Sequence, residues 1–245
     1  MRIVTLALIA PLAACSMHSS DNAEAKGAAT GGSGNARSYA IVDFSEVDLR
    51  GSDNVDVRVG SAFSVRAEGP TAELDKLVID KVGGALRIGR KPAASFWGGD
   101  TYRSVKIFVT MPRIASAKLE GSGNLAIDSV EGSRFSGESA GSGNMTIDRL
   151  SVDAADLSST GSGEIVTSGG TARRLTLSIA GSGDISAPHL KASAADVSIA
   201  GSGNVTADVA GPAKVSIVGS GDADLGARAH CTTSKVGSGE VKCGG

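Results

Sequence analysis

Apolar and polar residues alternate with period two in the first part of the chain. Six segments show this alternation: 39–42, 55–59, 63–67, 77–79, 85–88 and 105–109. Because neighbouring side chains of a strand point to opposite faces, each segment is predicted to form a β-strand with one buried face. Only residues 71–76, which follow Pro70, indicate a helical turn. We expect an antiparallel sheet or sandwich-like part over residues 39–111.

A different pattern follows, in which Gly-Ser-Gly and then Asn, Asp or Glu recurs. The first glycines are Gly121, Gly141, Gly161, Gly181, Gly201, Gly219 and Gly237, so the spacing is 20 residues and then, for the last two intervals, 18. Positions four and six after each first glycine, and four before it, are mostly apolar. Residues two apart on a strand share a face, so a buried inner face is predicted on both sides of a glycine corner.

A repeat of this length with two short strands cannot bury its apolar face alone. Stacked coils with parallel strands are therefore expected, which is a β-helix over residues 112–245 with about seven coils. The strands of residues 39–111 would cap its N-terminal end. A calcium-binding roll of nine-residue repeats is disfavoured, because 20 is not a multiple of nine and the aspartates do not recur in every copy.

Composition agrees with an all-β chain and excludes some partners. Glycine supplies 34 of the 245 residues, and it destabilises helix interiors by about 1 kcal/mol each. Hydrophobic residues at 41% and charged residues at 20% indicate a folded protein. The net charge of −2 gives no bulk attraction to a polyanion, so no nucleic acid partner is expected.

The first residues indicate export. Residues 1–14 have one early positive charge and a short apolar run, which is typical of a signal peptide rather than a membrane span. The sequence Leu12-Ala13-Ala14-Cys15 resembles the lipobox of bacterial lipoproteins, which implies lipidation of Cys15 and a membrane anchor. Ser16 after the cysteine favours the outer membrane of a Gram-negative cell. The alternative is an ordinary signal peptide with an incidental cysteine. Residues 15–38 are predicted to form a flexible tether.

The other two cysteines flank the last motif. Cys231 and Cys243 lie six residues before and six after Gly237. In another coil the same offsets pair Leu175 with Ala187, as expected if the two positions share the volume of the lumen. In an exported protein this predicts a disulfide that closes the terminal coil, against the alternative of two buried free thiols.

Catalytic signals are weak. The repeated serines lack a histidine partner each and are expected to be turn residues, so no catalytic residue and no cofactor are predicted. Some of the residues directly after Gly-Ser-Gly are acidic, and they are expected to stack in neighbouring coils. One interpretation is that their carboxylates are oxygen ligands for Ca²⁺. Ordinary turn chemistry is the favoured one, with no metal bound. These acidic residues are Glu164, Asp184, Asp222 and Glu240.

Two features before the repeats are candidate contact surfaces. The stretch from Lys81 to Lys118 is strongly basic, and its polar faces could meet lipid phosphates or acidic glycans, or simply face solvent. A glycine-flanked loop concentrates three aromatic residues that could form a contact tip or plug the open end of the solenoid. The candidate contacts are Arg87, Arg90, Lys91, Phe96, Trp97, Tyr102 and Arg103.

The order of these elements resembles a known family. Strands, then Met111-Pro112-Arg113-Ile114, then the repeats beginning Ala117-Lys118-Leu119-Glu120-Gly121-Ser122-Gly123-Asn124, resemble the putative auto-transporter adhesin head GIN domain over about residues 39–243. The resemblance implies a two-part all-β protein with a right-handed parallel β-helix. We expect a non-catalytic envelope lipoprotein that binds an envelope glycan or protein, or has a structural role. The alternative is a polysaccharide-processing hydrolase or lyase, which the single aromatic of the repeats, Phe135, disfavours.

Overall fold

The computed structural model describes residues 25–27, 29–31, 34–92 and 103–244. The expected signal peptide, Cys15, most of the expected tether and the aromatic loop with Phe96, Trp97 and Tyr102 therefore lie outside the described residues. Within the described part strands predominate, and α1 (Thr71–Leu74) is the one helix. The all-β prediction is confirmed, including the helical turn after Pro70.

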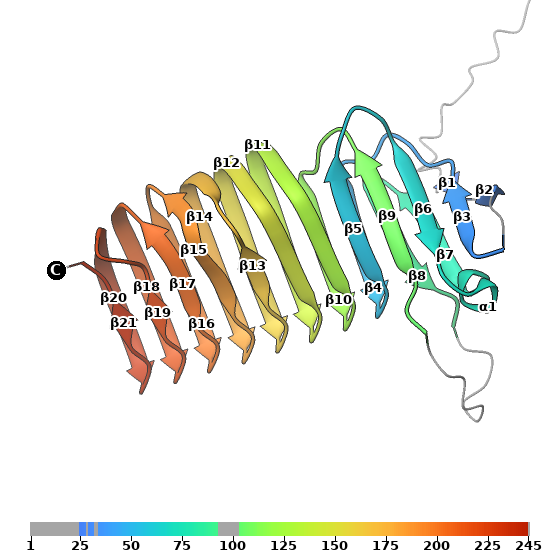
Figure 1. Ribbon diagram of the computed structural model, residues 1–245. Coiled ribbons are helices and arrows are strands. Elements are labelled where there is room, and N and C mark those ends of the chain that lie inside the picture. Colours follow the sequence, from blue (N-terminus) through green and yellow to red (C-terminus); the bar gives the residue numbers. More distant parts are fainter. Residues whose placement is uncertain (1–24, 28, 32–33, 93–102, 245) are drawn as a thin grey trace, which may run out of the picture.

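The repeats form a β-solenoid whose turns stack side by side along one axis (Figure 1). Equivalent residues pair in parallel register, so that Leu125 lies beside Met145 and Met145 beside Ile165. The strands are β10 (Ser116–Gly121), β11 (Asn124–Gly141), β12 (Asn144–Gly161), β13 (Ile165–Thr167), β14 (Gly170–Gly181), β15 (Ile185–Ala192), β16 (Ala195–Gly201), β17 (Val205–Val209), β18 (Gly211–Gly219), β19 (Ala223–Asp224), β20 (Ala229–Gly237) and β21 (Val241–Lys242).

The solenoid has about six turns, where the sequence predicted about seven coils. The difference has a simple geometric reason. Each Gly-Ser-Gly motif marks a corner and not a whole turn, so the seven corners from Gly121 to Gly237 enclose six complete turns.

The N-terminal strands form a mixed sheet that continues the solenoid. They are β1 (Ala25–Lys26), β2 (Ala29–Gly31), β3 (Ala36–Tyr39), β4 (Glu46–Gly51), β5 (Asn54–Val59), β6 (Ser64–Glu68), β7 (Leu77–Val82), β8 (Ala85–Arg90) and β9 (Lys106–Met111). β4 pairs in parallel with β10 and β8, and β5 with β11 and β9. The outer strands β1, β2, β3, β6 and β7 pair in antiparallel fashion. Alternation predicted the faces of these strands, but it carries no information about the direction of a partner strand.

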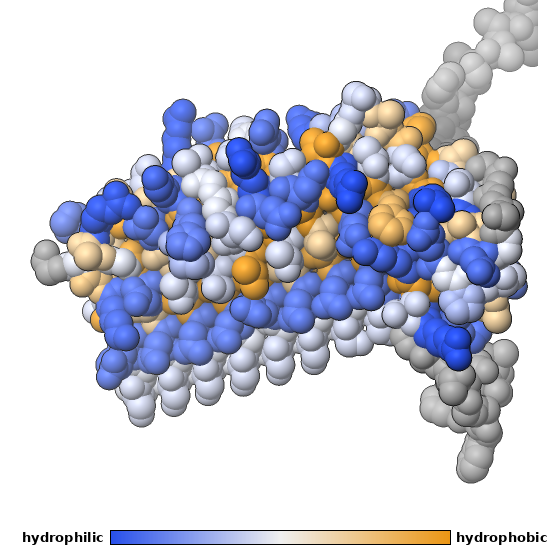
Figure 2. All heavy atoms as spheres, viewed as in Figure 1, coloured by the Kyte–Doolittle hydropathy of each residue, from blue (hydrophilic) through white to orange (hydrophobic). Residues whose placement is uncertain are grey.

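Glycine is required at the repeated corners by backbone approach. The first glycine of each motif has φ between +118° and +137°, a region that side chains disfavour. The third glycine lies against the previous turn: a Cβ on Gly183 would lie 2.2 Å from the carbonyl oxygen of Gly163. Figure 2 shows the corners as a regular pale ridge along the lower edge, with a hydrophilic row beside it.

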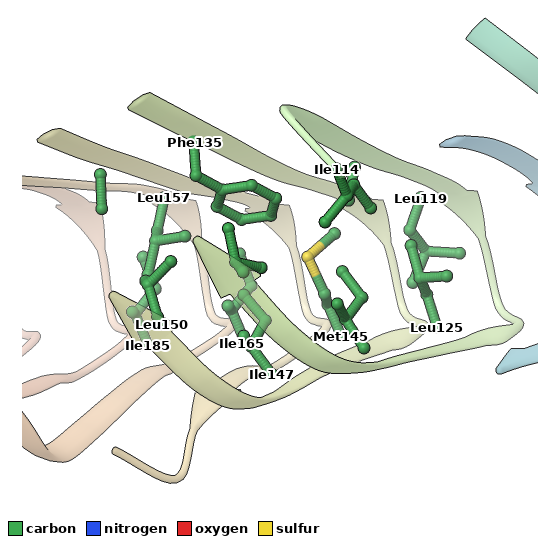
Figure 3. Packing of buried hydrophobic residues seen from close by; sticks show 14 of the residues in the cluster. Ile114, Leu119, Leu125, Phe135, Met145, Ile147, Leu150, Leu157, Ile165 and Ile185 are labelled. Atoms are coloured by element: carbon green, nitrogen blue, oxygen red, sulfur yellow. The ribbon is translucent and has the colours of Figure 1, made fainter. Parts of the chain in front are cut away.

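The core fills the lumen of the solenoid with aliphatic side chains. Phe135 is fully buried, and Figure 3 shows it directed into the same interior as Leu157 and Met145. Gly137 lies at an inner position, in register with Leu157. A Cβ there would lie 3.2 Å from the Phe135 ring and 3.3 Å from the Met145 sulfur, so the glycine leaves room for the ring.

Strand β20 of the C-terminal turn has polar, exposed residues at positions in register with buried residues of β18. Lys235 follows Ile217 in register, and its Nζ donates a hydrogen bond of 2.6 Å to the carbonyl oxygen of Gly239. Cys231 and Cys243 are joined by a disulfide, with their Cα atoms 6.2 Å apart. An inward-directed charge on an edge strand discourages pairing with other chains. This turn therefore closes the end of the solenoid.

Candidate functional site

A groove crosses several turns of the solenoid. Its residues lie about midway in sequence between successive Gly-Ser-Gly corners. Its volume is about 430 Å³. Its floor consists of small residues stacked one per turn, because they are register partners in consecutive strands. These floor residues are Gly132, Val152, Ala172 and Ala192. With about 4.8 Å between strands, the floor runs parallel to the solenoid axis over roughly 15 Å. We call this feature the axial groove.

The change of repeat length explains why this region is hollow. Turns of 20 residues give way to turns of 18 residues after Gly201, while the Gly-Ser-Gly corners remain in register. The loss falls away from these corners: the pairing of β15 with β17 skips three residues between Ala187 and Lys191, and one residue is regained before Ala213, which leaves a net loss of two. The shorter turns leave a step in the surface, and the groove includes this step.

Charged and hydroxyl-bearing side chains line the groove above its floor. Arg173 Nε lies 3.1 Å from Asp153 Oδ1 of the preceding turn. Arg228 Nη2 lies 2.8 Å from an oxygen of Asp208, which is also one turn away. Lys191 is exposed and has no ion pair among the described residues. Asp153 and Asp208 balance two of the three cations, so Lys191 gives the groove an excess of one positive charge, and the groove offers donors to an anionic or hydroxyl-rich ligand.

The residues that follow Gly-Ser-Gly, which include the four acidic residues considered as Ca²⁺ ligands, form hydrogen bonds between neighbouring turns. A backbone N–H in one turn donates to the side-chain oxygen of the equivalent residue in the turn before. The bonds run from Glu164 to Asn144, Asn204 to Asp184, Asp222 to Asn204 and Glu240 to Asp222, over 2.7–3.2 Å. Within residues 25–92 and 103–244, as far as they are described, no three His, Cys, Asp or Glu side chains gather as a metal site. The side chains of Asp184 and Asp222 thus connect successive turns, and Glu164 and Glu240 take part through their backbone N–H groups.

The basic residues predicted as contacts form ion pairs and hydrogen bonds within the N-terminal part of the chain. Arg87 Nε lies 3.3 Å from Asp48 Oδ2, and Lys91 Nζ donates to the carbonyl oxygen of Asp75 over 2.7 Å. Arg90 is only 14% exposed and pairs with buried carboxylates. The carbonyl oxygen of Arg103 accepts a hydrogen bond of 3.1 Å from Arg90 Nη2. Arg90 is thus held inside the N-terminal part, whereas Arg87, Lys91 and Arg103 remain at least partly exposed.

Comparison with known proteins identifies the family. Residues 43–229, more than half of the chain, match the family described as "Putative auto-transporter adhesin, head GIN domain". The chain belongs to this family. No curated protein matches the sequence significantly. The predicted resemblance is confirmed by the match.

Three solved structures share the fold of this head GIN domain. A putative adhesin from Bacteroides fragilis NCTC 9343 has 22% identity and a TM-score of 0.77. A putative adhesin from Parabacteroides merdae ATCC 43184 has 19% identity and a TM-score of 0.70. A protein described as a putative lipid binding protein, from Parabacteroides distasonis ATCC 8503, has 25% identity and a TM-score of 0.63. Each comparison covers 85% of this chain and 95% of the other.

Family membership supports an adhesin-like, exported and envelope-associated protein. Among the described residues of this head GIN domain, no helix combines the length and apolar character that a membrane crossing requires. Sequence reasoning missed the groove residues Asp153, Arg173, Lys191 and Arg228. The change of spacing from 20 to 18 was visible in the sequence, and it is the signal that could have located the step.

Proposed function

We propose that this protein is a non-catalytic, adhesin-like binding module whose axial groove holds an extended anionic oligosaccharide. The observation that carries the proposal is that three cations, Arg173, Lys191 and Arg228, line a groove with a floor of small residues. A linear polymer can lie on this floor parallel to the solenoid axis and meet donors from successive turns. Hydroxyl groups of Ser151, Thr171 and Ser193 add uncharged contacts on the same walls.

A binding role is favoured over hydrolysis by the groove lining. Most glycoside hydrolases need two carboxyl groups that flank the scissile bond. The described lining holds one carboxylate, Asp153, and this group is paired with Arg173. We therefore assign the groove to ligand retention.

The binding experiment compares groove and control variants of the purified full-length protein. Calorimetric titration with oligogalacturonates should show saturable binding that weakens with added salt, because exposed charges are screened. The double variant Arg173→Ala/Lys191→Ala should bind roughly tenfold more weakly or worse. The control Lys214→Ala removes an exposed lysine from a different face and should bind normally. Equal affinity of the double variant, or shortening of the oligosaccharide during the titration, would overturn the proposal.

We also propose that the module is held at the outer membrane by a lipidated Cys15, with the residues that precede β1 as a tether. The predicted tether of residues 15–38 is too long, because β1, β2 and β3 pair with the N-terminal sheet. The lipobox-like sequence Leu12-Ala13-Ala14-Cys15 supports this proposal. Mass spectrometry of the natively exported protein should find a lipid-modified cysteine at the N-terminus, and Cys15→Ala should release the protein from the membrane fraction. An unmodified N-terminus, or membrane association that survives the substitution, contradicts the anchor.

A further inference from the structure

Phe108 points outward from the sheet, away from the core. Its neighbours on β9, Ile107 and Val109, are fully buried, whereas Phe108 itself is partly exposed. Three of the described phenylalanines, Phe44, Phe63 and Phe135, belong to the core or pack against it, and Phe108 does not. Figure 2 shows a hydrophobic patch over β9 that is framed by hydrophilic residues. The ring therefore contributes apolar surface to the solvent-facing side.

Polar groups of both signs surround the ring. Phe108 lies in register between Arg66 of β6 and Asp56 of β5, so one side chain stands on each side of it. Lys106 Nζ lies 5.2 Å from the centroid of the ring and 2.9 Å from Asp56 Oδ2. Arg66 Nη2 lies 2.7 Å from Glu68 Oε1. The patch thus offers a carboxylate acceptor and a guanidinium donor beside an aromatic face.

The contacts around Phe108 also define what kind of ligand fits. The two ion pairs, Lys106 with Asp56 and Arg66 with Glu68, leave the patch without net charge. The side chains of Lys106 and Arg66 are 53% and 54% exposed, so both can move when a ligand arrives. The Lys106 ammonium lies above the Phe108 ring, so a ligand that packs on this face takes the place of the ammonium, and the exposed lysine side chain moves aside.

We propose that Phe108, Asp56, Arg66 and Lys106 form a second binding site, which takes a neutral hexopyranose ring. The apolar C–H face of the sugar packs on the Phe108 ring. Its hydroxyl groups donate to the Asp56 carboxylate and accept from the Arg66 guanidinium. A neutral sugar is favoured because the patch has no net charge, in contrast to the cationic axial groove. This site lies on the N-terminal strands and is independent of the groove.

Saturation-transfer NMR on the full-length protein tests this site with cellotriose, maltotriose and mannotriose as probes at millimolar concentration. At least one probe should give signals from a single terminal ring. Phe108→Ala should abolish these signals, and Phe108→Trp should preserve them. Val166→Ala, a substitution on an outward position of β13, should leave them unchanged. Because Phe108 is outside the core, thermal unfolding of Phe108→Ala should match the parent protein, which shows that any loss of binding is local.

The groove variant keeps the two proposals apart. Arg173→Ala/Lys191→Ala should bind the neutral trisaccharide normally, and Phe108→Ala should bind oligogalacturonate normally. The proposal is overturned if none of the three trisaccharides gives a signal, or if Phe108→Ala retains the signal of the parent protein. Loss of the neutral-sugar signal in the groove variant would also overturn it, because the site would then not be independent.

Discussion

Arg90 donates two hydrogen bonds to the carboxylate of Asp53, 2.7 Å from Nε and 2.6 Å from Nη2. Asp53 also accepts the backbone N–H of Val105 over 2.8 Å, and Arg90 Nη1 pairs with Glu73. Gly51 lies in register with Gly121, so Asp53 occupies the place of the third glycine of the motif. This aspartate connects the first rung of the solenoid to the N-terminal strands and to α1.

Replacing Asp53 with glycine gives this corner the Gly-Ser-Gly sequence of the other corners. This substitution should nevertheless destabilise the protein. Asp53→Gly leaves Arg90 without its main partner and the buried Val105 N–H without an acceptor, which costs about 3 kcal/mol. Chemical denaturation should show a lower midpoint than the parent protein. Asp196→Asn removes an exposed aspartate and is the control, with a change within about 0.5 kcal/mol. A stable Asp53→Gly variant would contradict the anchoring role.

Acid sensitivity should come partly from Glu73. Hydrogen bonding from Arg90 lowers the pKa of Glu73, outweighing the effect of burial, with a further contribution from Lys76. The stability from this ionised carboxyl is complete above its unfolded pKa of about 4.3 and is lost as the pH falls through the lower folded value. The difference in unfolding free energy between the parent protein and Glu73→Gln should therefore shrink as the pH falls below about 4. A pH-independent difference would contradict the ion pair.

The repeat made most of the solenoid predictable. Seven copies of Gly-Ser-Gly fixed the period, the inner positions and the parallel stacking, because a glycine corner recurs only where turns approach closely. The corner at residues 51–54, with the sequence Gly-Ser-Asp-Asn, does not match the repeated motif because Asp53 stands in place of the third glycine. Strand direction in the N-terminal part was not predictable either, since alternation reports burial and not the partner strand.

The binding surfaces were harder to predict for a physical reason. The axial groove depends on where two residues are lost between turns of 20 and 18, and the sequence shows the loss but not the corner that absorbs it. Phe108 belongs to the alternating segment 105–109, but it occupies one of the positions that alternation assigns to polar residues. An aromatic residue at an outward position was the available signal.

Glycine is needed at some positions because of a close backbone contact and at others because of a positive φ. Substitution by alanine should distinguish these two reasons. Gly183→Ala places a Cβ 2.2 Å from a backbone oxygen, so neighbouring turns must move apart. Gly132 has φ of +148°, but a Cβ at this position would have no atom within 4 Å, so Gly132→Ala adds only backbone strain, about 1 kcal/mol. Denaturation midpoints should be lower for Gly183→Ala than for Gly132→Ala. The reverse order would contradict the packing explanation of the motif.

The disulfide should stabilise the C-terminal turn. A bond between Cys231 and Cys243, which are 12 residues apart, contributes about 3 kcal/mol in the chain-entropy model. Replacing both cysteines with alanine should increase hydrogen exchange of β20 before it affects β11. Thiol counting on denatured, unreduced protein provides the independent check, because two reactive thiols in natively exported protein would rule out the bond.

The role of the axial groove is tested most directly by chemical-shift mapping. Titration of the ¹⁵N-labelled full-length protein with oligogalacturonate should shift the amides of residues 151–153, 171–173 and 191–193 in a saturable way, while the spectrum of the sugar shows no new reducing ends. Saturable shifts confined to the Gly-Ser-Gly ridge, no shifts at millimolar sugar, or the appearance of cleaved products would contradict a non-catalytic binding groove.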